Sequence, residues 1–220
     1  MHTNKKDAFN SLFPFEIMKL RFGRYTVLTV ILVLTLSSVS ISHPHVFIVN
    51  RLTVVFDDQG LAGIQAKWIF DEFFSSMIAG DYDRNHNGKL ENSEVNIIKK
   101  EAFSYLAEYQ YFTFIKIEGK PFKVKYIRDF SASLTKGKLT YEFFIPCHVN
   151  ATVAYKALTI SQHDPTYYTA VFFADNRPVS YEGGSGFETT YDIAENRKES
   201  YYFGMIHPIE LILKFRVKNG

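Results

Sequence analysis

Two short stretches of the chain carry side chains whose types and spacing suit metal ions. The first is His43-Pro44-His45. In an extended chain, residues two apart point the same way and lie about 6.6 Å apart, so both imidazoles can approach one ion. Imidazole nitrogen suits zinc, copper and nickel. The stretch predicts a transition-metal site, with zinc as the favoured ion and nickel or copper as alternatives.

The second stretch is residues 83–94, which read D-R-N-H-N-G-K-L-E-N-S-E and match the calcium-loop pattern D-x-[DN]-x-[DN]-G-x5-E. Such a loop surrounds calcium with oxygen atoms, and its glycine permits the sharp turn. The ligand positions hold Asp83, Asn85, Asn87, Lys89 (through its carbonyl), Glu91 and Glu94. A single loop favours a structural calcium clamp over a sensor. The alternative is a degenerate loop that binds no ion, because two early ligands are Asn rather than Asp.

The segment before the histidines has the features of an export signal. Residues 25–36 form an apolar run that follows Lys19, Arg21 and Arg24 and precedes the small residues of SSVSIS. This order predicts a signal peptide over residues 18–42, cleaved after Ser42, and residues 1–17 would be an extension or a misassigned start. Cleavage would make His43 the N-terminal residue and add its α-amino group to the metal site. The predicted location is the periplasm.

Composition narrows the class of protein. The 220 residues are 46% hydrophobic and 22% charged, which is typical of a globular chain. The single cysteine, Cys147, excludes an intramolecular disulfide and a multi-cysteine zinc site. Residues 1–42 hold 5 of the 25 Lys and Arg and 2 of the 23 Asp and Glu, which leaves a net charge of −1 beyond them. We therefore expect no nucleic-acid partner. We recognise no nucleophile–base pair and expect no enzymatic activity.

The pattern of apolar residues predicts the elements that position these stretches. A β-hairpin is expected from residues 46–56 and 61–70, followed by helices over 71–82, capped by Asp71, and 93–109. Further strands are expected at 111–117, 122–130, 139–145, 152–161, 168–174, 187–193 and 209–217, with a loop at 176–186. This predicts one α+β domain over residues 43–220. It is a mainly antiparallel β-domain with an EF-hand-like helix–loop–helix pair inserted after the first hairpin, at about residues 71–109.

Other side chains must complete a site built on two histidines. The candidates are His163 or Asp164, Asp71 or Glu72, His148 and His207. We favour His163 or Asp164, because this pair stands where a predicted strand ends and the chain turns. Asp71 lies at a strand–helix junction. The alternative is that His43 and His45 are ordinary polar residues at the start of a strand.

Five segments in order resemble a known bacterial family: SHPHVFI at 42–48, WIFDEFFS at 68–75, the calcium-type loop, YQYFTF at 109–114 and DPTYY at 164–168. The family is of unknown function and is described as the periplasmic component of zinc- or nickel-type transport systems, with ZevA-like members. The resemblance implies an inner-membrane partner of the nickel/cobalt-permease type. His43, His45, Asp71 and Asp164 fall on its motif positions.

Three functions are compatible with these observations. The first is a periplasmic transition-metal-binding accessory protein of a permease system. The second is a copper-brace redox enzyme, which would need a further histidine such as His163 at the metal. The third is a calcium-stabilised binding or adhesion module in which the histidines are incidental.

Overall fold

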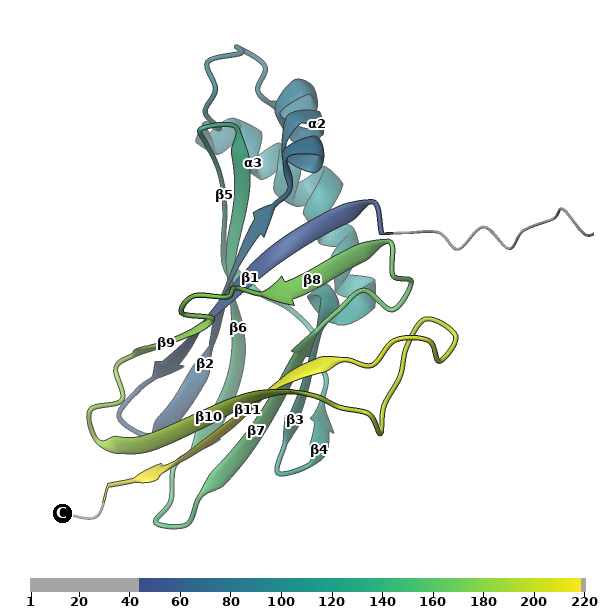
Figure 1. The fold of residues 1–220 in the computed structure, drawn as a ribbon. Coiled ribbons are helices and arrows are strands. Elements are labelled where there is room, and N and C mark those ends of the chain that lie inside the picture. Colours follow the sequence, from purple (N-terminus) through teal and green to yellow (C-terminus); the bar gives the residue numbers. More distant parts are fainter. Residues whose placement is uncertain (1–43, 219–220) are drawn as a thin grey trace, which may run out of the picture. The chain divides into compact units, whose positions relative to one another are not determined.

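The computed structural model describes residues 44–218, whose strands form a six-stranded and a five-stranded sheet (Figure 1). The predicted signal peptide and His43 lie outside these residues. Among the residues described, no helix is long and apolar enough to cross a membrane.

The predicted first hairpin is confirmed. It consists of β1 (Val46–Phe56) and β2 (Gly60–Phe70), paired antiparallel. The Asp57 carboxylate accepts the backbone N–H groups of Gln59 and Gly60 and so closes the turn. Along β1, buried residues alternate with exposed or half-buried ones, which gives the hairpin one face toward the core.

The first sheet has the order β5–β6–β2–β1–β8, and β9 also pairs with β1. The added strands are β5 (Arg128–Thr135), β6 (Lys138–Asn150), β8 (Thr169–Phe173) and β9 (Val179–Glu182). Both β8 and β9 run parallel to β1, whereas the remaining strand pairs in residues 44–218 are antiparallel. The mainly antiparallel β-fold is confirmed, but the prediction of a loop over 176–186 is wrong because it contains β9.

The second sheet is entirely antiparallel, in the order β10–β11–β7–β3–β4. Its strands are β10 (Phe187–Glu195), β11 (Ile209–Val217), β7 (Lys156–Gln162), β3 (Thr113–Ile117) and β4 (Lys120–Phe122). The predicted strand 122–130 is wrong: residues 123–127 lie between β4 and β5 and pair with neither sheet. Pro121 and the basic residues that follow it favour such a break.

Helical segments follow the hairpin, namely α2 (Glu72–Tyr82), α3 (Asn92–Ile98), η1 (Lys99–Phe103) and η2 (Ser104–Phe112). The single regular helix predicted over 93–109 is wrong. The segment changes to π-helical geometry in η1 and to 3-10 geometry in η2. It ends with three consecutive residues of left-handed backbone, Gln110, Tyr111 and Phe112, at φ of 54°, 53° and 52°.

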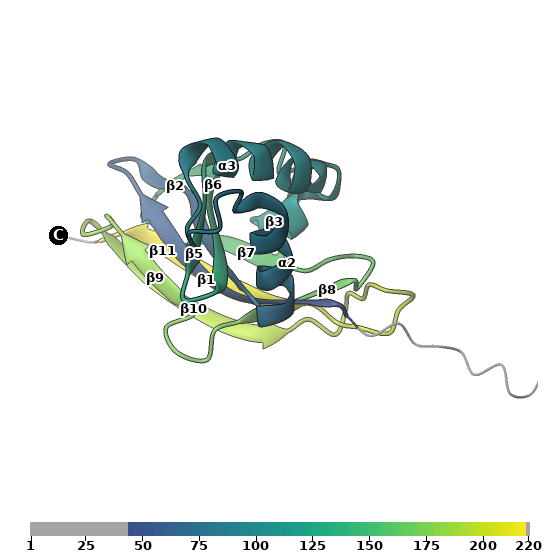
Figure 2. The same cartoon turned by 90° about the horizontal axis from the view of Figure 1, so that it is seen from above.

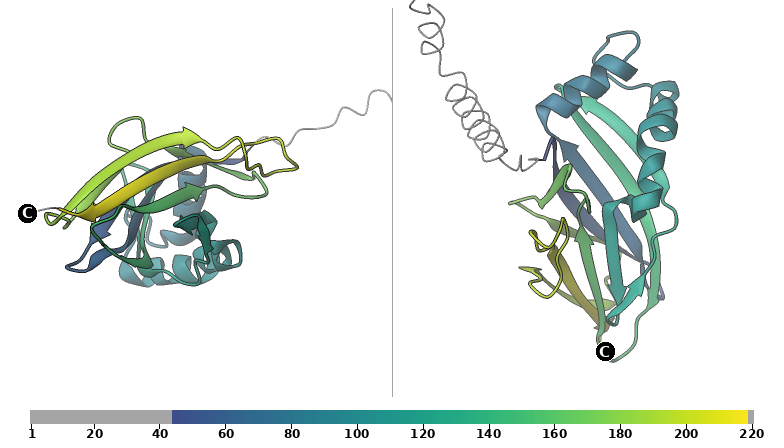
Figure 3. Two further views of the ribbon diagram at one scale, coloured as in Figure 1. Left: turned by 90° about the horizontal axis from the view of Figure 1, so that it is seen from below. Right: turned by 90° about the vertical axis from the view of Figure 1, so that its right-hand side faces the viewer.

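One face of the first sheet is covered twice. At one end the second sheet covers it, where the rings of Phe56 and Phe215 lie 5.4 Å apart. At the other end the helical segments cover it (Figures 2 and 3). There the ring of Trp68 lies 6.4 Å from the ring of Phe103. All four side chains belong to one buried apolar cluster. The hairpin therefore contributes side chains to both parts of the core.

Two glycines give a matched test of this packing. Gly63 lies at an irregularity of the β2–β6 ladder, and a Cβ there would come within 2.4 Å of Phe144 and 2.5 Å of the Ile145 carbonyl. Gly63→Ala should lower the free energy of unfolding by about 1–3 kcal/mol. Gly80 in α2 has open space around it, so Gly80→Ala should raise that free energy by about 0.5–1 kcal/mol. Urea denaturation of both variants measures the two effects, and a loss of stability at both positions would contradict the packing described.

Candidate functional site

Asp71 is the residue that joins β1, β2 and α2. Its Oδ1 accepts the Phe74 N–H at 2.9 Å, which confirms the predicted helix cap. Its Oδ2 accepts the Phe47 N–H at 2.7 Å, and its own N–H donates to the Phe47 carbonyl. The Asp71 carboxylate is therefore held two residues along β1 from His45. Each oxygen accepts one of these bonds and has a further lone pair available.

His45 lies at the start of β1, and its side chain is exposed. Its N–H donates to the Tyr168 carbonyl at 2.8 Å, and its ring lies 5.0 Å from the Tyr168 ring. His45 lies immediately before β1, whose pairing with β8 begins at Val46 and Thr169. Phe47 and Val49, which follow on β1, are also exposed.

Asp164 is buried and folds the turn that leads into β8. Its Oδ1 accepts the N–H and the hydroxyl of Thr166, each at 2.8 Å, and its Oδ2 accepts the Thr169 N–H at 3.0 Å. This turn carries Tyr168 to the side of His45. Asp164 is thus linked to His45 through the backbone, while its carboxylate is engaged in three hydrogen bonds.

His163 lies apart from Asp164, although the two are adjacent in sequence. Its ring is stacked between Phe114 and Tyr201, at 4.3 Å from each ring, and its Nδ1 is 2.9 Å from the Ser161 hydroxyl. Burial lowers the pKa of His163 to about 4, although Asp164 and Glu199 act to raise it. His163 and Asp164 line different cavities. The structure therefore does not bring this imidazole and this carboxylate together.

Three further candidates from the sequence lie in separate places. Glu72 is exposed in the first turn of α2. His148 is 3.5 Å from Asp57 at the far end of the first hairpin, and the His207 ring is 2.7 Å from the Glu199 carbonyl. Across residues 44–218, no three His, Cys, Asp or Glu side chains gather in a way that could hold a metal ion. A transition-metal site that includes His43 stays a prediction.

The loop between α2 and α3 is closed by its own acidic side chains. The buried Asp83 carboxylate accepts the backbone N–H groups of Asn87 at 3.1 Å and Gly88 at 2.8 Å. The Glu94 carboxylate accepts those of Arg84 and Glu91, each at 2.9 Å. Asp83 and Glu94, at the first and last ligand positions of the calcium-type pattern, therefore stabilise the loop by accepting its backbone N–H groups.

The other ligand positions of this loop interact with one another. Glu91 accepts the side-chain amides of Asn85 at 3.3 Å and Asn87 at 2.5 Å. The pKa of Glu91 is lowered to about 2, first by its hydrogen bond with the Glu94 side chain and then by the two amides. Lys89 donates its N–H to the Asn87 side chain, and His86 is exposed. Glu91 is therefore ionised at neutral pH and gathers the amides of the loop around one carboxylate.

Comparison with known proteins places the chain in a family. Residues 28–202 match the model of a family described as proteins of unknown function, DUF1007. The chain belongs to this family. An uncharacterized 15.5 kDa protein from the trpE 3' region of Spirochaeta aurantia is 31% identical over 128 residues, which cover 58% of this chain and 91% of that protein. An uncharacterized protein of Haemophilus influenzae is 26% identical over 147 residues, which cover 64% and 68% of the two chains. Membership in DUF1007 assigns no activity.

Burial of His163 predicts a dependence of stability on pH. The folded pKa of about 4 lies below the ordinary value of 6.5, so the unfolded chain binds the proton more tightly. The stabilising contribution of neutral His163 is complete above pH 6.5 and declines as the pH falls toward 4. Between pH 7 and pH 4, the free energy of unfolding should fall by about 3 kcal/mol more in the wild type than in His163→Phe. Urea denaturation at both pH values measures this, and an equal difference for the exposed control His86→Phe would contradict it.

Proposed function

We propose that the chain is a periplasmic, transition-metal-binding accessory protein of a zinc- or nickel-type permease, with a structural calcium ion in loop 83–94. The observation that supports the metal site is the placement of His45. His45 is exposed immediately before β1, its N–H donates to the Tyr168 carbonyl, and its ring lies 5.0 Å from the Tyr168 ring. The sequence supplies a second imidazole two residues earlier, at His43.

Asp71 is the carboxylate that the geometry favours for completing the site. Two backbone N–H groups hold it at the junction of β1 and α2, and each oxygen retains a lone pair. By contrast, the Asp164 carboxylate is buried and accepts three hydrogen bonds, and His163 is enclosed by aromatic rings. In the proposed site Asp164 supports His45 indirectly by shaping the turn that carries Tyr168.

The surface beside His45 is consistent with a protein partner. Phe47 and Val49 are exposed on the same side of β1, and Phe172 of β8, which pairs with Val49, is also exposed. Exposed apolar groups that adjoin one another commonly mark interaction sites. A protein that passes an ion to a permease must present the ion next to the surface that the permease covers. The resemblance noted in the sequence suggests this kind of partner.

Titration of the exported, processed protein with zinc, nickel and copper tests the metal site. His45→Ala should weaken binding of the preferred ion by about tenfold or more, because one of few nitrogen ligands is lost. His148→Ala is the matched control, since this half-exposed histidine lies at the other end of the hairpin. Isothermal calorimetry in competition with a chelator of known affinity gives the constants. Equal effects of the two substitutions would refute a site at His45.

Loop 83–94 fits calcium in its chemistry. It offers three carboxylates, two side-chain amides and a carbonyl at the ligand positions, all oxygen donors of the kind that calcium prefers. Asp83 and Glu94 already draw the loop's backbone N–H groups around themselves. The Asn85 and Asn87 amides, which donate to Glu91, would hold calcium through their oxygens instead. Bound calcium would neutralise the acidic side chains of the loop and join α2 to α3.

Calcium should therefore stabilise the folded chain. At a concentration about 100 times the dissociation constant, binding adds about 2.7 kcal/mol, which raises the melting temperature by roughly 5–10 °C in a protein of this size. Glu94→Gln should remove most of this shift, whereas His86→Ala, in the same loop, should retain it. Differential scanning calorimetry with calcium, with magnesium and with a chelator measures the shift. A shift that survives Glu94→Gln would place the ion elsewhere.

A further inference from the structure

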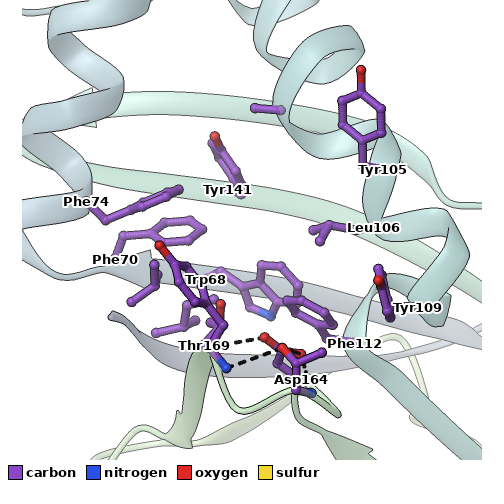
Figure 4. Close-up of a pocket in the computed structure, with 15 residues that line it drawn as sticks. Trp68, Phe70, Phe74, Tyr105, Leu106, Tyr109, Phe112, Tyr141, Asp164 and Thr169 are labelled. Atoms are coloured by element: carbon purple, nitrogen blue, oxygen red, sulfur yellow. Dashed lines mark hydrogen bonds between the residues drawn. The ribbon is translucent and has the colours of Figure 1, made fainter. Parts of the chain in front are cut away.

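An apolar cavity of about 350 Å³ lies between the first sheet and the helical segments (Figure 4). Its floor is formed by Trp68 and Phe70 of β2 and by Tyr141 of β6. Its walls include Phe74 of α2 and Phe112 of η2. This volume is within the range of small-molecule sites, which are concave, mostly apolar and provided with a few polar groups. Nothing in the metal or calcium proposal uses this cavity.

Within residues 44–218, buried hydrogen-bonding groups without a partner lie on Tyr141, which lines the cavity, and on Asn50, which does not. Asn50, Trp68 and Tyr141 are neighbours in register across β1, β2 and β6, and all three are buried. The Trp68 indole N–H donates to Gln162 at 3.1 Å. The Tyr141 hydroxyl and both polar side-chain atoms of Asn50 have no hydrogen-bond partner within residues 44–218. Each buried polar group without a partner costs about 1–3 kcal/mol, and Tyr141 brings one such group to the floor of the cavity.

The wall opposite the sheet is built from irregular backbone. Ala102 lies in the π-helical η1, and Tyr105, Leu106 and Tyr109 lie in η2. The segment ends at the left-handed residues 110–112, of which Phe112 lines the cavity. π-Helical turns and left-handed non-glycine residues are costly and are concentrated at functional sites. Here such residues form part of the cavity wall in place of a regular helix.

The edge of the cavity is polar and acidic. Asp164, Thr166 and Thr169 line it on the side of the turn before β8, and Figure 4 shows Asp164 and Thr169 next to Trp68. Lys and Arg are absent from the residues that line the cavity. A carboxylate with no balancing cation in the lining disfavours an anionic ligand.

We propose that this cavity binds a small, largely apolar organic molecule, uncharged or cationic, that stacks on Trp68 and carries a hydrogen-bonding group. The aromatic lining provides the apolar surface, and Tyr141 is the nearest unpaired group on the floor. Asp164 sets the preference against anions. The inference stands independently of the proposed metal function, because it rests on the interior of the helical half and not on His43 or His45.

The probe is N-phenyl-1-naphthylamine, an uncharged aromatic amine, added to the exported protein. Trp68 is the chain's single tryptophan, so its emission and its one indole N–H signal in NMR report on the cavity floor. We expect saturable binding at one site, with energy transfer from Trp68 and a shift of the indole signal. The affinity for the anionic dye 8-anilinonaphthalene-1-sulfonate should be lower than that for the amine by about tenfold or more.

Two substitutions that fill the cavity are compared with one outside it. Ala102→Phe and Leu106→Phe should each weaken binding of the amine by about tenfold or more. Phe172→Ala, which removes an exposed ring from the outer side of the first sheet, should leave the affinity unchanged. Circular dichroism melting verifies that each variant is folded. The indole shift needs no variant and therefore tests the proposal even if both filled forms fail to fold. No saturable binding, an unshifted indole signal, tighter binding of the anion, or loss of binding only in Phe172→Ala would each overturn the assignment.

Discussion

The first sheet depends on strand β1, because β1 is hydrogen-bonded along both edges to segments that lie far apart in sequence. On one edge it pairs with β2 through a local turn, and on the other with β8 and β9, more than a hundred residues later. Its inward residues Leu52 and Val54 are fully buried, so a shift of one residue would expose them and bury polar neighbours. The position of His45 beside Tyr168 follows directly from this register.

The second sheet and the helical segments cover the buried face of the first sheet. Many of the buried aromatic side chains lie where these two layers meet that face. The second sheet packs closely over the end near Phe56, while the helical segments stand over the end near Trp68. Large rings fill the wider space, as in the edge contact of Trp68 with Phe143 at 4.8 Å. The irregular η1 and η2 leave the remaining space unfilled, and this space is the cavity.

Local signals in the sequence predicted local structure well. The hairpin, the Asp71 cap and the position of β11 follow from alternation, turn residues and capping chemistry within a few residues of each other. Pairing of β1 with β8 and β9 depends on contacts across the whole chain, so no neighbouring residues could indicate it. The left-handed backbone of residues 110–112 could not be predicted from the sequence, because none of the three is a glycine.

The candidate site was predicted in part, and one available signal was missed. His163 and Asp164 follow the end of a strand, where successive side chains point to opposite faces, so their separation could have been inferred from the alternation. The role of Asp164 in its turn could also have been predicted, because an aspartate in a turn commonly accepts a hydrogen bond from the backbone N–H of the residue two positions later, here Thr166. Tyr168 had no such signal, since its contact with His45 exists only once β8 lies beside β1.

Tyr168 connects the two proposals physically. Its ring lies 5.0 Å from the His45 ring, tilted by 41° to it, and Tyr168 also lines the apolar cavity. A ligand that changes the position of this ring would alter the surroundings of the imidazole, and an ion held by the imidazole would restrict the ring in turn. Because the two sites share this ring, linkage requires each ligand to change the affinity of the other by the same factor. The strength of this coupling depends on how firmly Asp164 holds the turn, because its carboxylate accepts three hydrogen bonds, from Thr166 and Thr169, on either side of Tyr168. A buried carboxylate that binds neither ligand can therefore influence both sites.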